Sequence, residues 1–173
     1  MSIHIIIDGY NLIRQSSSFS DLDRQDIQLG REALLDSLAA YQRIKHHKIT
    51  VVFDGANAPT FSRNKYRVKG ISVKFSHKGE LADSVIKRMV SREREKALVV
   101  SSDMDVVNFA ATKGAATIRS SDFEEKITMA AYMDIKGIER EGEDGWIPTT
   151  KKKGPSKRLS KRKRRDRIKT RKL

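Results

Sequence analysis

Acidic residues stand at the ends of three short apolar runs in this sequence. Asp8 follows three isoleucines, Asp54 follows a Val-Val-Phe run, and Asp103 and Asp105 follow a Val-Val-Ser-Ser run. If these runs are parallel strands of one sheet, the acids meet outside the carboxyl ends of the strands, where such sheets bind ligands. Gathered carboxylates repel one another, and a bound divalent cation removes that cost. The pattern therefore favours a site for Mg²⁺ or Mn²⁺, which prefer carboxylate oxygens.

Each of these acids also has a structural explanation when it is considered alone. An Asp after a strand most often caps a helix or forms a turn. An acid at the corresponding point of three strand ends favours the metal site over that explanation. Asp54 is the exception, because Asp54 and Gly55 lead into a long loop. At Asp54 a turn and metal ligation have equal weight.

A further acid is expected from the helix predicted over residues 81–92. Apolar side chains form a stripe on this helix, and a step of about 100° per residue places Asp83 on the flank of the stripe. Glu80 projects almost opposite the centre of the stripe, so we expect it to face solvent or to cap the helix. Asp83 can reach the buried edge of the sheet. Its alternative role is an interaction with the helix dipole or with Lys87.

Short β-branched runs alternate with longer helical stretches along the chain. The helical spacing of apolar residues predicts helices over residues 25–47, 81–92, 105–112 and 121–135. Nearly all-apolar runs predict strands over residues 3–7, 49–53, 71–75, 97–101 and 115–118, and Gly, Asn and Pro predict a loop over 55–66. Apolar strands separated by helices are typical of an α/β domain whose mostly parallel sheet is covered on both faces.

Four motifs occur in a fixed order and carry a family resemblance. They are Ile5-Ile6-Ile7-Asp8-Gly9-Tyr10-Asn11, Val51-Val52-Phe53-Asp54-Gly55, Ala82-Asp83-Ser84-Val85-Ile86 and Val99-Val100-Ser101-Ser102-Asp103-Met104-Asp105. Together they resemble the YacP-like NYN family of PIN-like ribonuclease domains, over residues 3–135 and the basic end. The resemblance implies a three-layer α/β/α sandwich with a central, mostly parallel sheet.

The same resemblance implies metal-dependent cleavage of RNA. The residues that match the acidic site of the family are Asp8, Asp83, Asp103 and Asp105, and Asn11 matches its supporting polar residue. The family includes a ribosome-associated endoribonuclease of Gram-positive bacteria that cuts mRNA at the ribosomal A site. The implied partners are therefore RNA and, more specifically, mRNA on the ribosome or rRNA.

Charge is distributed unevenly over the 173 residues. The net charge is +14, and residues 151–173 alone carry 14 basic residues and one acid. We expect a nuclease domain over residues 1–136, a linker over 137–150 and a polybasic tail over 151–173 that is disordered or partly helical. The apolar residues of the tail are too few to form a core: Leu159, Ile168 and Leu173.

Composition excludes several other classes. The chain has no cysteine, which excludes disulfide scaffolds, Cys-ligated zinc and thiol catalysis. No apolar run approaches the ~20 residues of a membrane helix, and Asp8 interrupts the first apolar run, unlike a signal peptide. We therefore expect a cytoplasmic protein without a membrane partner. No Gly-rich dinucleotide or Walker A motif is present.

Two basic segments are candidates for RNA binding. The first alternates its cations with other residues, so that an extended chain places them on one side: Arg63, Lys65, Arg67 and Lys69. Phe61 or Tyr66 could stack on bases there, but an edge strand with protective charges explains this stretch equally well. The second is the dense run of the tail, which is typical of polyanion binding: Lys157, Arg158, Lys161, Arg162, Lys163, Arg164 and Arg165.

The acids and the basic segments together favour an endoribonuclease that uses two divalent cations. Two cations about 3.5–4 Å apart can activate water and stabilise both the phosphoryl charge and the leaving oxygen, and the sequence offers no Ser-His-Asp arrangement. The first alternative is a catalytically silent RNA- or ribosome-binding protein that keeps the fold. The second is a haloacid-dehalogenase-type phosphatase, which needs another Asp where Tyr10 stands.

Overall fold

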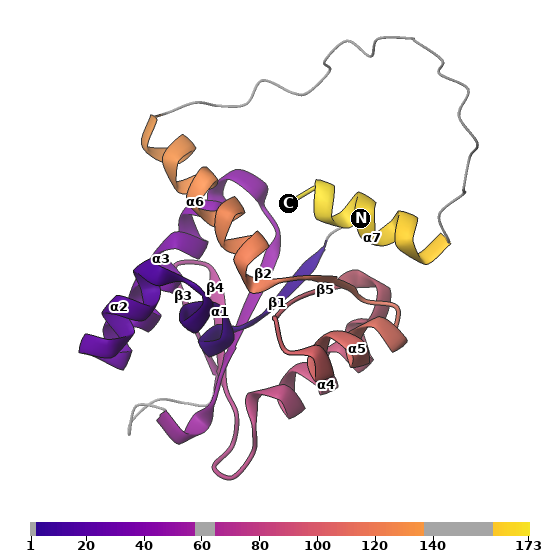
Figure 1. Ribbon diagram of the computed structural model, residues 1–173, viewed down its shortest axis with the longest axis horizontal. Helices are drawn as coiled ribbons and strands as arrows, with labels where there is room; N and C mark the ends of the chain where they lie inside the picture. Colours follow the sequence, from indigo (N-terminus) through magenta and orange to yellow (C-terminus); the bar gives the residue numbers. More distant parts are fainter. Residues whose placement is uncertain (1–2, 58–64, 137–160) are drawn as a thin grey trace.

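A six-stranded sheet forms the centre of the computed structural model, which describes residues 3–57, 65–136 and 161–173 (Figure 1). The strands are β1 (His4–Asp8), β2 (Lys48–Phe53), β3 (Lys65–Val68), β4 (Ile71–Phe75), β5 (Ala97–Val100) and β6 (Ala116–Ile118). Their order is β3-β4-β2-β1-β5-β6, and every pair is parallel except β3 with β4. Strand β1 therefore lies between β2 and β5, where the strand order changes direction and sheets of this kind bind ligands.

Helices cover both faces of the sheet and produce three layers (Figure 1). One face carries α1 (Gly9–Gln15), α2 (Ser17–Gln25), α3 (Ile27–Lys45) and α6 (Ser120–Lys136), and the other carries α4 (Ala82–Glu93) and α5 (Met104–Thr112). Short 3-10 turns lie at Gly55–Asn57 and Arg94–Lys96. Because side chains alternate along a strand, Ile5 and Ile7 face the first layer and Ile6 faces the second, and all three are fully buried. The α/β sandwich expected from the sequence is confirmed.

The last helix, α7 (Lys161–Arg171), packs against β6. Leu173, just beyond it, is only 4% exposed and belongs to the same core as Tyr41, whose hydroxyl donates a hydrogen bond to the Leu173 carbonyl oxygen at 3.2 Å. Arg165 forms an ion pair with Glu95, and Lys169 donates to the Glu95 carbonyl oxygen. The tail is therefore partly helical, as expected. The apolar residues of the tail are too few to form a core of their own, but α7 carries the Leu173 side chain into the core of the domain.

The expected strands and helices are present, with ends that differ by one or two residues. Helices α1 and α2 were not predicted. The seven residues of α1 are too few for a periodic signal, and α2 begins in a serine-rich stretch with weak helix preference. Helix α2 forms because the Ser16 side chain caps it by accepting the Phe19 N–H at 3.2 Å. The expected linker, residues 137–150, lies outside the described residues. None of the described helices is long and apolar enough to cross a membrane.

Candidate active site

Asp8 stands at the end of β1 and caps helix α1. Its Oδ1 accepts a hydrogen bond from the Asn11 N–H at 3.3 Å, and the residue is only 8% exposed. Burial raises the pKa of Asp8 to about 6, and the negative charges of Asp83 and Asp103 act in the same direction. Asp8 thus caps a helix, as an Asp after a strand most often does. It is also a carboxylate whose ionised form the protein stabilises poorly.

Ser101 joins the ends of β1 and β5. Its fully buried hydroxyl donates to Asp8 Oδ2 at 3.3 Å and accepts the N–H of Asp103 at 3.1 Å. Asp103 in turn caps α5, because its Oδ1 accepts the Asp105 N–H at 2.7 Å. The two acids therefore lie at neighbouring strand ends, as predicted, with one serine between them.

Asn11 connects three segments around this pair of acids. Its side-chain oxygen accepts the Ser102 N–H at 2.8 Å and the hydroxyl of Ser120 at 2.7 Å. Helix α1 is thereby fixed both to the turn after β5 and to the start of α6. The supporting polar role expected of Asn11 has a physical basis in these contacts.

Asp83 lies in the first turn of α4, half-buried beside the apolar side of the helix. Burial raises the pKa of Asp83, the charge of Asp103 raises it further, and Lys87 opposes these effects. Glu80 has other partners, since it forms an ion pair with Arg88 and accepts the N–H of His77 at 3.3 Å. The helical projection thus separated the two acids correctly. Glu80, however, is held by Arg88 rather than simply facing solvent.

Asp54 and Asp105 have additional partners. Asp54 Oδ1 accepts the Ala56 N–H at 3.1 Å, so that the turn role is present, and its side chain also lines the cavity described next. Asp105 is exposed and forms an ion pair with Lys87 of α4. The structure therefore brings Asp54 toward the site and leaves Asp105 at its rim.

A cavity of about 330 Å³ lies at the carboxyl ends of β1, β2 and β5. We call it the acidic cavity, because three acids line it: Asp8, Asp54 and Asp103. Tyr10, Asn11 and Arg14 also belong to its lining. Two glycines allow close packing beside these acids. A Cβ on Gly9 would lie 2.3 Å from the Phe53 ring, and one on Gly55 would lie 1.9 Å from the Ser76 carbonyl oxygen. The Asp-Gly pairs thus serve close packing around the cavity.

The chemistry of these side chains fits a divalent cation. Among the described residues, no three Asp, Glu or His side chains converge closely enough to form a complete metal site. The carboxylates of Asp8 and Asp83 nevertheless have raised pKa values because of burial and the negative charges of neighbouring acids, Asp103 among them. A cation in the acidic cavity would favour their ionised forms. The residues that would hold it are Asp8 and Asp103 of the cavity lining and Asp83, which follows the lining residue Ala82, with Asp105 at the rim.

The first basic segment lies on the opposite edge of the sheet from β6. Lys65 and Arg67 are exposed on edge strand β3, and Lys69 forms an ion pair with Asp36 at 2.5 Å. Tyr66 stacks on Phe75 with ring centroids 6.1 Å apart, so it packs on the core and is not presented to a base. The structure therefore shows an edge strand with exposed cations, and RNA binding by Lys65 and Arg67 stays a prediction. Phe61 and Arg63 lie outside the described residues.

The basic residues of the tail are only partly described. Lys157 and Arg158 lie outside the described residues, and Lys161, Arg162 and Arg164 belong to the first turn of α7. Lys163 is exposed and Arg165 pairs with Glu95. RNA binding by this set stays a prediction.

Sequence reasoning missed the serines that organise the site. Ser101 and Ser120 are fully buried, and each donates to an acid or amide of the cavity. Ser101 ends an otherwise apolar buried strand, and a small hydroxyl there is a signal that the sequence did contain. Ser120 carries no comparable signal, because its role depends on where α6 meets α1.

Known proteins share the organisation of this chain. A family model described as YacP-like NYN domain matches residues 5–172. The uncharacterized protein YacP of Bacillus subtilis (strain 168) is 28% identical over 85 residues, which is 49% of this chain and 49% of that protein. The chain thus aligns with about half the length of this relative.

Two solved structures have the same fold. The crystal structure of Rae1 (YacP) from Bacillus subtilis superimposes with a TM-score of 0.67 at 22% identity, over 79% of each chain. A single-residue mutant of the same protein gives a TM-score of 0.63 at 20% identity, over 75% of this chain and 77% of that one.

Proposed function

This chain belongs to the YacP-like NYN domain family, and on that basis we propose that it is a metal-dependent endoribonuclease. The observation that carries the proposal is the state of Asp8. It is buried at the central strand end, beside the charges of Asp83 and Asp103, with a pKa raised to about 6. Capping of α1 does not require a carboxylate that is destabilised in this way, and a bound cation would stabilise its charge.

Mg²⁺ or Mn²⁺, as a pair of ions, is the cofactor in this proposal. The residues that would hold them are Asp8, Asp83, Asp103 and Asp105. Bound cations of this kind supply an activated water and stabilise charge on the phosphoryl and leaving oxygens. The protein keeps the carboxylates in place: Ser101 orients Asp8, and Asn11 fixes the turn that carries Asp103.

RNA is the proposed substrate. The family supports it, and so does the charge of residues 151–173, which attracts polyanions by releasing their counterions. The more specific form of the proposal is action on mRNA at the ribosome, in the cytoplasm, as part of mRNA decay.

The test is incubation of the purified protein with mixed cellular RNA, with and without Mg²⁺ or Mn²⁺, followed by mapping of new 5′ ends. We expect metal-dependent ends that disappear in Asp8→Asn and in Asp103→Asn. The matched control is Asp21→Asn, since Asp21 is exposed and forms an ion pair with Arg24.

Undiminished cleavage by both Asp8→Asn and Asp103→Asn would overturn the site. RNA binding by the wild-type protein without any cleavage would favour the catalytically silent binding protein instead.

A further inference from the structure

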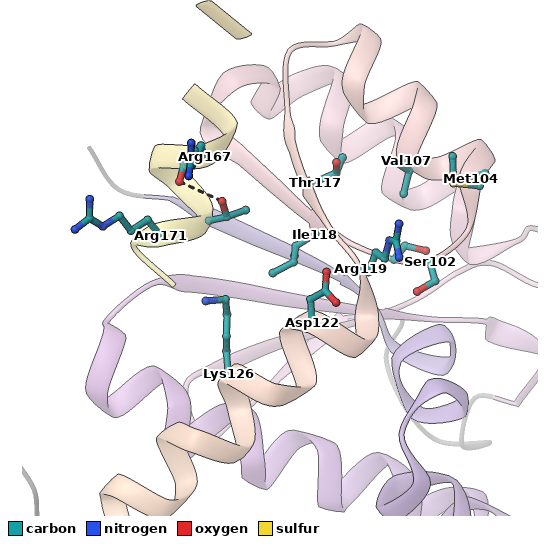
Figure 2. Close-up of a pocket in the computed structure, with 12 residues that line it drawn as sticks. Ser102, Met104, Val107, Thr117, Ile118, Arg119, Asp122, Lys126, Arg167 and Arg171 are labelled. Carbon is teal, nitrogen blue, oxygen red and sulfur yellow. Dashed lines mark hydrogen bonds between the residues drawn. The ribbon is translucent and has the colours of Figure 1, made fainter. Parts of the chain in front are cut away.

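A second and larger cavity lies between α5, α6 and α7, beside the short edge strand β6 (Figure 2). Its volume is about 710 Å³, and we call it the basic cleft. Its charged lining residues are four cations and one acid: Arg119, Lys126, Arg167, Arg171 and Asp122. Arg119, Asp122 and Lys126 come from the start of α6 and the residue before it, and the two other arginines come from α7 (Figure 2).

The cations of α7 divide into two groups. Arg165 and Lys169 contact Glu95 and hold the helix on the domain. Arg167 and Arg171, one helical turn apart, line the cleft instead. Within the described part of the chain, neither forms an ion pair, and the same holds for Arg119 and Lys126. Unpaired cations gathered on several elements around one cavity favour an anionic ligand.

The basic cleft and the acidic cavity share a wall. Ser101, Ser102 and Met104 line the cleft, and Asp103, in the same turn, lines the acidic cavity. The Met104 side chain is 64% exposed at this boundary, where a flexible apolar thioether can pack against an unpaired base. A polymeric ligand that is bound at Asp103 can therefore extend directly into the basic cleft.

We propose that the basic cleft binds the phosphate backbone of the RNA strand on one side of the cleaved bond. This inference rests on the proposed function, because it places the flank of the same substrate. Single-stranded RNA suits the cleft since its phosphates meet a cationic groove and its bases are free to contact an apolar side chain at the rim. Helix α7 thus builds one wall of the substrate path.

The experiment compares a cleft variant with a charge-matched control. The variant carries Arg119→Gln, Lys126→Gln, Arg167→Gln and Arg171→Gln. The control carries Gln at four exposed cations elsewhere: Arg24, Lys48, Lys78 and Arg92. Melting temperatures show that both proteins fold. The affinity for a 20-nucleotide single-stranded RNA is measured across a salt series without divalent cations, because each phosphate contact contributes about −0.7 to the slope.

We expect the salt slope of the cleft variant to become shallower by about 3, and that of the control to stay near wild type. If the fourfold variant does not fold, Lys126→Gln and Arg167→Gln alone are each expected to change the slope by about 0.7. Equal slopes for cleft variant and control would overturn the proposal.

A cleavage assay then separates this proposal from the proposed function. Wild-type kcat/KM is expected to rise when a short RNA is lengthened on one side of the cleaved bond, and the cleft variant is expected to lose that gain. If the cleft variant keeps the full rise in kcat/KM, the proposed role of the basic cleft is wrong, and the proposed nuclease activity is unaffected. A wild-type protein that binds RNA through the cleft but never cleaves it would instead overturn the nuclease activity alone.

Discussion

The hydroxyl of Ser101 donates a hydrogen bond to Oδ2 of Asp8 across 3.3 Å, although the two residues are 93 positions apart in the sequence. The hydroxyl oxygen of Ser101 also accepts the N–H of Asp103 at 3.1 Å. One buried serine therefore lowers the pKa of the central acid, against the larger effect of burial, and fixes the position of its neighbour.

Ser101→Ala is expected to reduce cleavage and to shift its dependence on pH. The hydrogen bond from Ser101 lowers the pKa of Asp8, so its loss raises that pKa further above its ordinary range. The acidic limb of the pH profile of kcat/KM should move to higher pH. Ser17→Ala, at an exposed position of α2, serves as the control. An unshifted profile for Ser101→Ala would contradict the role assigned to this serine.

Asp8→Asn is expected to stabilise the metal-free protein at neutral pH. The folded pKa of Asp8 is about 6 against 3.8 as the ordinary value, so the wild type loses stability as pH rises from about 4 through 6. Two pKa units correspond to about 3 kcal/mol, and Asn keeps the helix cap. Thermal unfolding of both proteins in a chelator, from pH 4 to 8, measures the difference.

The difference in melting temperature between Asp8→Asn and the wild type should grow with pH and level off above pH 7. Added Mg²⁺ or Mn²⁺ should narrow it by stabilising the wild type. A gap that does not change with pH would show that burial of the Asp8 charge is not the cause.

Asp83→Asn and Glu80→Gln should separate the two acids near the start of α4. Asp83 lies near the charge of Asp103, whereas Glu80 is held by Arg88. We expect Asp83→Asn to reduce kcat by at least tenfold and Glu80→Gln to leave it within about twofold. Single-turnover cleavage at saturating protein gives the rate constant of each variant. A larger loss in Glu80→Gln than in Asp83→Asn would show that Glu80, and not Asp83, is the metal ligand.

Leu173→Ala is expected to destabilise the protein by about 2–4 kcal/mol, the usual cost of removing a buried leucine side chain. Leu173 is 4% exposed beside Tyr41, whereas Ile168 on the same basic helix is 57% exposed. Ile168→Ala should therefore change the free energy of unfolding by less than about 0.5 kcal/mol. Urea unfolding of the full chain gives both values, and equal values would show that α7 does not dock through Leu173.

The sequence was informative where apolar periodicity was strong. The apolar strands and helix α4 had clear patterns, and acids at strand ends lie together because parallel strands share one carboxyl edge. The side of the helix on which Asp83 lies followed from the same periodicity. These predictions depended on local pattern and on one rule of sheet topology.

The remaining features depended on contacts between distant segments. The pairing of Asp105 with Lys87 requires the placement of α5 beside α4, which no local pattern contains. The burial of Leu173 requires a docked α7, and an isolated leucine in a polycation gives no periodic signal. The basic cleft exists because α7 packs against β6 and leaves a cavity between itself and the start of α6.

The central position of β1 has a consequence for the protein during its own synthesis. The strand that carries Asp8 is made first, but its partner β5 and the acid that follows come almost a hundred residues later. Parallel strands so far apart pair slowly, because a long loop must close first. The emerging chain thus exposes Asp8 long before Asp103 is made. A nascent chain of this protein would therefore lack the paired acids until β5 has left the ribosome, and the proposed cleavage of RNA could begin only after that point.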